Sequence, residues 1–132
     1  MRLERTGMVS IDLTGKTALV TASSAGIGFA IALRLAEAGA EVIVNGRSEE
    51  SVARAVAEIN AQVEDAARGI VADAADEAGA AGLVAQAGRV DLLVNNPGSF
   101  EAPEGPAIGQ APRRRCFETK VLAGVGLSRR PV

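Results

Sequence analysis

The sequence contains no histidine, tryptophan or tyrosine, and its single cysteine is Cys116. Without histidine, the zinc and non-haem iron sites built on imidazole are excluded, and so is acid–base catalysis by histidine. A lone cysteine forms no internal disulfide, which fits a reducing compartment. No apolar run approaches the roughly 18 residues of a membrane span, and the first residues lack the apolar core of a signal peptide. We therefore expect a cytoplasmic protein with no metal site and no membrane span.

An excess of charge of one sign is also missing. The chain has 14 basic and 16 acidic residues, for a net charge of −2, so nothing in its electrostatics favours a nucleic-acid partner. Two short basic runs, at 113–115 and 129–130, are expected to be solvated surface. The 132 residues, 48% of them hydrophobic, suffice for one globular domain with its own core.

Short apolar segments alternate with segments of helical spacing along the first hundred residues. The apolar segments predict strands over 16–21, 41–45, 68–71 and 90–94. Helices are predicted over 26–38, from 49 onward behind a Ser48 cap, and over 77–87. The first helix is apolar nearly all round, so we expect it to be well buried. This alternation predicts an α/β fold with parallel strands and right-handed crossovers.

The strongest candidate for a binding site is the turn over residues 21–28, between the first strand and the first helix. Small residues there allow a diphosphate to approach the backbone, and a helix N-terminus offers free N–H groups and the positive end of its dipole. A purely structural turn is the alternative. The residues predicted to bind the cofactor here are Ala22, Ser23, Ser24, Gly26, Ile27 and Gly28.

The end of the second predicted strand bears on the choice of cofactor. A site for NAD(H) places an acidic side chain there to bind the ribose hydroxyls, but this chain has Asn45-Gly46-Arg47 and no carboxylate before Glu49. The planar guanidinium of Arg47 suits a 2′-phosphate. We therefore predict NADP(H) in preference to NAD(H), the alternative being that Arg47 is simply an exposed arginine after a turn.

Together these motifs resemble the short-chain dehydrogenase/reductase family. Residues 12–21 resemble its opening strand, and residues 21–28 its Thr-Gly-x-x-x-Gly-x-Gly turn, with Ala22 in place of the first glycine. The resemblance implies that Asp73 contacts the adenine, although Asp73 could instead cap the next helix. Asn95-Asn96-Pro97-Gly98 is similar to the family's Asn-Asn-Ala-Gly motif, which implies that Asn96 and Gly98 lie near the nicotinamide ribose.

The family fold implied is a Rossmann-like parallel sheet in the strand order 3-2-1-4, incomplete relative to the seven strands of the family. We expect one partial domain over 1–132. Its parts are an N-terminal extension (1–11), a dinucleotide-binding core (12–98), an irregular proline-rich loop (99–115) and a C-terminal helix (116–130).

The resemblance does not extend to the chemistry. Lys120 stands where the family has a catalytic asparagine, and the family's catalytic serine and Tyr-x-x-x-Lys pair have no counterpart, so we predict no catalytic residue. The first hypothesis is thus a truncated oxidoreductase without activity of its own. The alternatives are a non-catalytic dinucleotide-binding module, a subunit that completes a partner chain, and a reductase that uses unfamiliar groups. The strand over 90–94 and the last helix are expected to promote self-association.

Overall fold

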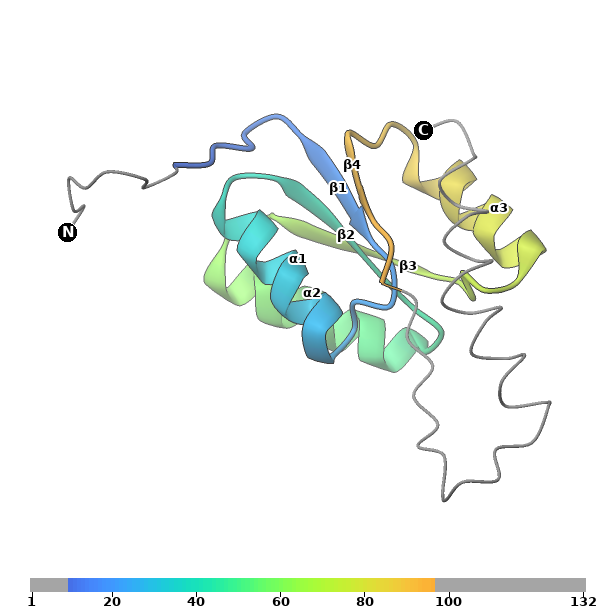
Figure 1. Cartoon of the computed structure of the whole chain (residues 1–132). Helices are drawn as coiled ribbons and strands as arrows, with labels where there is room; N and C mark the ends of the chain where they lie inside the picture. Colours follow the sequence, from blue (N-terminus) through green and yellow to red (C-terminus); the bar gives the residue numbers. More distant parts are fainter. Residues whose placement is uncertain (1–9, 97–132) are drawn as a thin grey trace, which may run out of the picture.

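The computed structural model describes residues 10–96 of the chain (Figure 1). Strands and helices alternate, and every strand pairing is parallel, in the order β3-β2-β1-β4. The predicted α/β class and strand order are therefore confirmed. The elements are β1 (Thr17–Val20), α1 (Gly26–Glu37), β2 (Glu41–Gly46), α2 (Glu49–Gln62), β3 (Ala67–Val71), α3 (Glu77–Ala87) and β4 (Leu92–Val94).

The sheet is covered on both faces. Successive side chains of a strand point to opposite faces, and in β1 Ala18 and Val20 join the core beneath α1 and α2, whereas Leu19 joins the core beneath α3. Figure 1 shows α1 and α2 next to each other on one side of the sheet and α3 on the other. Strands buried on both faces are nearly continuous in apolar residues, which is why the sequence marked them clearly.

The first helix differs from expectation. Its buried residues are the small ones, Gly28, Ala32 and Ala36, which recur every four residues and so share one face. The larger apolar side chains lie half-buried beside this stripe, and Ile27 is 75% exposed. The expectation that this apolar helix is well buried was wrong, because only the stripe of small residues, and not the bulky ones, is buried against the sheet.

The helix ends follow local side-chain chemistry. The predicted cap at Ser48 is confirmed, because its hydroxyl accepts a hydrogen bond from the backbone N–H of Ser51 at the start of α2. At the other end of α1, Gly39 has a φ of 104°, a left-handed conformation that glycine adopts without strain and that closes the helix.

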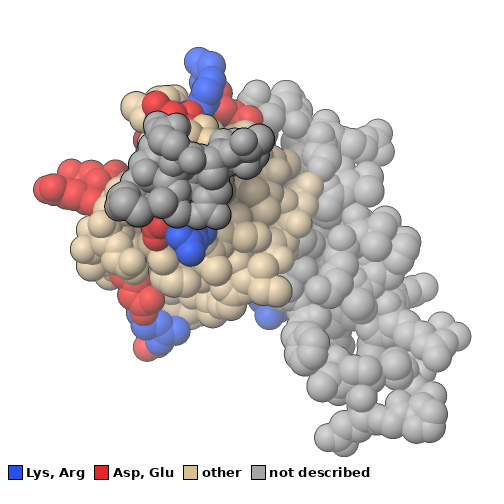
Figure 2. Space-filling model, turned by 60° about the vertical axis from the view of Figure 1, so that its left-hand side comes forward, with Lys and Arg blue, Asp and Glu red and all other residues tan. Residues whose placement is uncertain are grey.

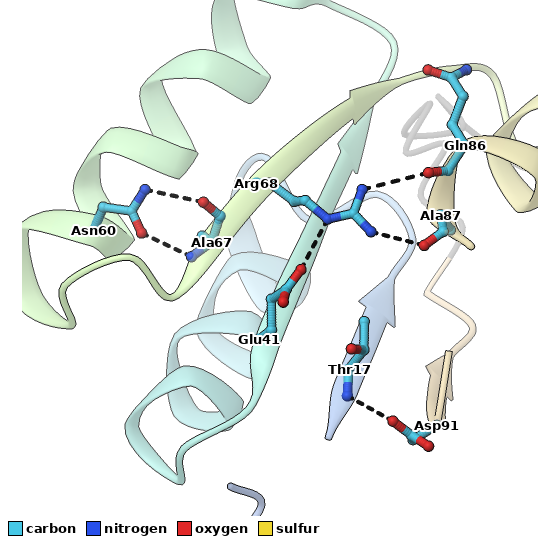
Figure 3. Close-up of polar contacts among 8 residues, drawn as sticks. All are labelled: Thr17, Glu41, Asn60, Ala67, Arg68, Gln86, Ala87 and Asp91. Atoms are coloured by element: carbon cyan, nitrogen blue, oxygen red, sulfur yellow. Dashed lines mark hydrogen bonds and ion pairs between the residues drawn. The ribbon is translucent and has the colours of Figure 1, made fainter. Parts of the chain in front are cut away.

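Side chains tie the strands together at their amino ends (Figure 3). The Asn60 side chain donates a hydrogen bond to the carbonyl oxygen of Ala67 (3.0 Å) and accepts one from the N–H of Ala67 (2.8 Å). The N–H of Thr17 donates to the Asp91 carboxylate at 2.9 Å. These contacts fix β3 to α2 and β1 to the segment before β4.

Arg68 makes a second set of contacts at this end of the sheet. Its Nε donates to the Glu41 carboxylate (3.0 Å), and its terminal nitrogens donate to the carbonyl oxygens of Gln86 (3.5 Å) and Ala87 (2.8 Å) (Figure 3). A cation at the last carbonyls of α3 offsets the negative end of the helix dipole. The amino ends of the strands are thus held by structural contacts, which leaves their carboxyl ends for a site.

Figure 2 shows acidic and basic side chains side by side around the margin of one face, without a patch of one sign. Within residues 10–96, no helix has the length and apolar character needed to cross a membrane. Residues 97–132, with the predicted loop over 99–115 and helix over 116–130, lie outside the described residues.

Candidate functional site

The carboxyl end of β1 leads directly into the predicted turn, and Ser23 anchors that turn inside the fold. Its hydroxyl is fully buried, donates to the carbonyl oxygen of Val20 (2.7 Å) and accepts from the N–H of Asn45 (3.0 Å). The N–H of Ser23 donates to the carbonyl oxygen of Asn45 (2.8 Å). The hydroxyl of Ser23 thus joins β1 to β2, and its predicted contact with a cofactor stays a prediction.

Ala22 stands in an unusual backbone conformation. Its φ is 51°, and within residues 10–96 only Ala22 and Asp65 combine a side chain with a positive φ. Glycine adopts this conformation freely, whereas a Cβ is strained there. The N–H of Ala22 donates to the Asn45 side chain at 3.3 Å. The alanine that stands in place of the motif's first glycine thus adopts a conformation that glycine favours.

The N-terminus of α1 carries no side-chain cap. Ala25 is the capping residue, and the first donor to bond back to it is the N–H of Phe29. By contrast, α2 and α3 begin with capping side chains and with acidic residues in their first turns, and α1 has neither. The first N–H groups of a helix need an acceptor from outside it. Those at the start of α1 are placed to bind an anion.

The surroundings of this helix end are open. Gly26 has a φ of 63°, and a Cβ built there would meet nothing within 4 Å. The adjacent Ile27 presents its side chain to solvent. Ser24 lies half-buried against the end of β2, with its Oγ 3.0 Å from the position that a Cβ of Gly46 would take. The backbone at Gly26 is thus accessible from outside the turn.

On its inner side the turn is tightly packed. A Cβ at Gly28 would overlap the carbonyl oxygen of Ala22 and come within 2.6 Å of the Asn96 side-chain nitrogen. Asn96 comes from the end of β4: its N–H donates to the hydroxyl of Thr21 (2.8 Å), and its side chain donates to the Ala22 carbonyl oxygen (3.4 Å). The structure thus brings Asn96 to the turn, as expected, whereas Gly98 lies outside the described residues.

Sequence analysis did not single out the role of the Asn45 side chain. This residue is 2% exposed at the end of β2, and its amide group donates to the carbonyl oxygens of Ile70 (3.1 Å) and Ala72 (3.2 Å) while its oxygen accepts from Ala22. The only sequence signal is a polar amide inside an otherwise apolar strand. Buried amides are normally hydrogen-bonded, so such a residue indicates a polar junction.

Arg47 and Asp73 follow the carboxyl ends of β2 and β3. Arg47 is exposed and has no hydrogen bond or ion pair with any described residue. Asp73 is also exposed, and its carboxylate accepts from the N–H of Ala75 (3.0 Å) in a local turn. The alternative in which Asp73 caps the next helix is wrong, because α3 is capped by Asp76, whose carboxylate accepts from the N–H of Gly79 (3.0 Å).

The predicted residues thus gather at one edge of the sheet. The turn and Asn96 are in direct contact, and Arg47 and Asp73 stand at the same carboxyl edge, where parallel α/β sheets bind their ligands. The side of β1 that faces β4 is the point at which the strand order reverses. Within the described residues, no group of three or more cysteine, histidine or acidic side chains is placed to hold a metal ion.

The fold and the turn together are those of an α/β protein of Rossmann type. The family model described as short chain dehydrogenase matches residues 16–130, and the chain belongs to this oxidoreductase family. It is 45% identical over 123 residues to an uncharacterized oxidoreductase, YvaG, of Bacillus subtilis, in an alignment that covers 92% of this chain and 47% of that protein.

Solved structures agree with this assignment. L-sorbose reductase from Gluconobacter frateurii, complexed with NADPH and L-sorbose, superposes with a TM-score of 0.83 at 27% identity, covering 92% of this chain and 48% of that one. A short-chain type dehydrogenase/reductase from Mycobacterium marinum gives 0.81 at 31% identity, covering 89% and 49%. The chain spans about half the length of the relatives it matches.

Proposed function

We propose that the chain binds a nicotinamide dinucleotide and prefers NADP(H) to NAD(H). The observation that carries the proposal is the start of α1, which has no capping side chain and no acidic residue and lies at the carboxyl end of β1. Its N–H groups and dipole suit the cofactor diphosphate. Binding of NAD(P) is the expectation for a short-chain dehydrogenase, and the related L-sorbose reductase was solved with NADPH.

The other parts of the cofactor are assigned to the ends of the neighbouring strands. Arg47 is proposed to bind the 2′-phosphate, because it is exposed and has no partner among the described residues. Asp73 is proposed to contact the adenine, and Asn96 and Gly98 to line the nicotinamide ribose. The bound cofactor would supply or accept a hydride, and these residues of the chain would bind and orient it.

The proposal is tested by titrating the full chain into NADPH and NADH. Binding is followed by the fluorescence of the reduced nicotinamide ring. Arg47→Ala should weaken NADPH binding about tenfold or more, the worth of a charge-assisted hydrogen bond to phosphate, and leave NADH binding unchanged. Arg54→Ala, which removes the same charge from an exposed position of α2, is the matched control and should have little effect.

Three results would contradict the proposal. A flat titration with both cofactors would refute the proposal that the chain binds a dinucleotide. Equal losses from the Arg47 and Arg54 variants, or equal affinities of the unmodified chain for NADPH and NADH, would remove the preference for NADP(H).

We further propose that these 132 residues bind the cofactor without turning over a substrate. The family resemblance assigns the proton transfer to a tyrosine, and the sequence has none. The second candidate is a binding module or subunit that completes a partner chain, favoured by β4, whose three residues are only half-buried at the edge of the described sheet. Steady consumption of NADPH with any of a panel of ketoses, ketones and 3-oxoacyl thioesters would refute the proposal that the chain turns over no substrate.

Sedimentation velocity over a range of concentrations tests the self-association predicted for β4. A monomer at all concentrations would contradict it. Location in the cytoplasm remains a prediction from the sequence.

A further inference from the structure

The Asn45 side chain bonds to two segments that lie on opposite sides of its own strand. On the β1 side its oxygen accepts from the N–H of Ala22 (3.3 Å). On the β3 side its amide nitrogen donates to the carbonyl oxygens of Ile70 (3.1 Å) and Ala72 (3.2 Å). Three of the four hydrogen-bonding positions of the amide are thus occupied inside the fold, in a residue that is 2% exposed.

Each of these segments adjoins a different part of the proposed site. Ala22 opens the turn that faces the cofactor diphosphate, and Ala72 directly precedes Asp73, which is assigned to the adenine. Asn45 itself lies two residues before Arg47. One buried amide is therefore bonded to the backbone at both ends of the surface that the adenosine diphosphate half of the cofactor would span.

We infer that Asn45 is a positioning residue of the dinucleotide site: it fixes the turn after β1 relative to the loop after β3, and so sets the separation between the diphosphate and adenosine contacts. The inference rests on the proposed function and adds a residue to it. A ligand that touches both segments gains from a preset separation, because it does not have to order them on binding. A ligand that touches one segment gains little.

The chemistry of the position restricts it to an amide. It must accept one hydrogen bond and donate two, a combination that asparagine offers and that an ionised aspartate cannot, since a carboxylate only accepts. Leucine has a similar shape but would remove all three of these hydrogen bonds. Asn45→Leu also leaves the charge near the diphosphate unchanged, whereas Asn45→Asp would add a negative charge there. Asn45→Leu is therefore the better test.

The chain contains a matched control at the amino end of β3. The Asn60 side chain also bonds to the backbone of β3, through the N–H and the carbonyl oxygen of Ala67 (Figure 3). It lies at the amino ends of the strands, away from the turn and from Asp73. Asn60→Leu should therefore lower the thermal stability of the chain without changing its affinity for the cofactor.

The experiment measures two ligands on the full chain and on both variants, at a temperature at which each is folded by circular dichroism. NADPH spans both segments, whereas adenosine 2′-phosphate reaches only the Arg47 and Asp73 side. Asn45→Leu should weaken NADPH about tenfold and adenosine 2′-phosphate less than about threefold, and Asn60→Leu should change neither. Equal losses for the two ligands, or equal NADPH affinities in the two variants, would show a purely structural role and overturn the inference.

A measurement on the unmodified chain keeps the inference testable even if Asn45→Leu does not fold. With saturating NADPH, the side-chain amide protons of Asn45 should exchange with water about tenfold more slowly by NMR, and those of Asn60 should not change. If the backbone amides of Gly26 and Gly28 respond to NADPH and the Asn45 amide does not, the inference fails while dinucleotide binding stands. If none of them responds, the proposed function fails, and the inference with it.

Discussion

Replacing Ala22 by glycine should make the chain more stable, although it removes a methyl group. Ala22 holds a φ of 51°, a left-handed conformation that costs a non-glycine residue about 1–2 kcal/mol. Three contacts keep it there: its N–H bonds to Asn45, its carbonyl oxygen accepts from Asn96, and that oxygen packs against Gly28. None of these contacts uses the Ala22 side chain, so a glycine can keep them all.

The net effect follows from three terms. Relief of the left-handed strain contributes about 1–2 kcal/mol in favour of glycine. Glycine loses about 0.5–1 kcal/mol more backbone entropy on folding, and the half-buried methyl group is worth a few tenths of a kcal/mol, roughly half of a buried CH₂. The balance is a stabilisation of about 0.5 kcal/mol, which for a domain of this size raises Tm by roughly 2–4 °C.

Thermal unfolding followed by far-ultraviolet circular dichroism measures this change. Ala22→Val should move Tm in the opposite direction, because a β-branched side chain is disfavoured more strongly at positive φ. Asp65 is the other described residue besides glycine that has a positive φ (54°). Asp65→Gly should raise Tm by less than Ala22→Gly, since aspartate tolerates this conformation better than alanine. A lower Tm for Ala22→Gly would refute the reasoning, because it would mean that the backbone of the turn is not strained.

Four further substitutions probe the packing and the charges. Gly28→Ala forces a methyl group into the turn and should cost about 1–3 kcal/mol in urea unfolding and weaken NADPH binding as well. Arg68→Met removes the cation from the end of α3 and should cost about 1–2 kcal/mol, whereas Arg89→Met, in an ion pair exposed at 87% on the arginine side, should stay within about 0.5 kcal/mol. The hydrogen bond from the N–H of Thr17 lowers the pKa of Asp91, so its contribution to stability is present above the unfolded pKa of about 3.9 and is lost as pH falls below it. Asp91→Asn should make unfolding below about pH 4 less steep in pH, and an unchanged slope would contradict the assignment.

The sequence predicted the strands and most helix bounds because their signals are local. The segment 77–87 was predicted as a helix and is α3, and Ser48 caps α2 as its side chain suggested. Two aspartates three residues apart, Asp73 and Asp76, both fit a cap by composition. The structure selects Asp76 because the helix begins at Glu77. A choice between similar local signals needs the backbone, and the sequence alone does not decide it.

The site was predicted less completely than the fold. Gly28 and Asn96 were expected there on the basis of motifs, and the structure brings them together. Asn45 was missed because its partners are backbone atoms that lie 23 to 27 residues away. Residues of any type can supply such atoms, so the sequence does not indicate these contacts. The exposure of Ile27 was missed for a related reason: hydrophobic content shows that a helix has an apolar face, but close contact with the sheet is decided by the small residues.

The pair of hydrogen bonds between Asn60 and Ala67 has a consequence for how the sheet meets other chains. An edge strand can pair with another chain through its unpaired backbone N–H and C=O groups. At the first residue of β3, the side chain of Asn60 already bonds to both of these groups of Ala67. β4 forms the other margin of the described sheet. The Asn60 side chain therefore discourages extension of the sheet at its β3 margin, where a joining strand would have to displace both hydrogen bonds to Ala67.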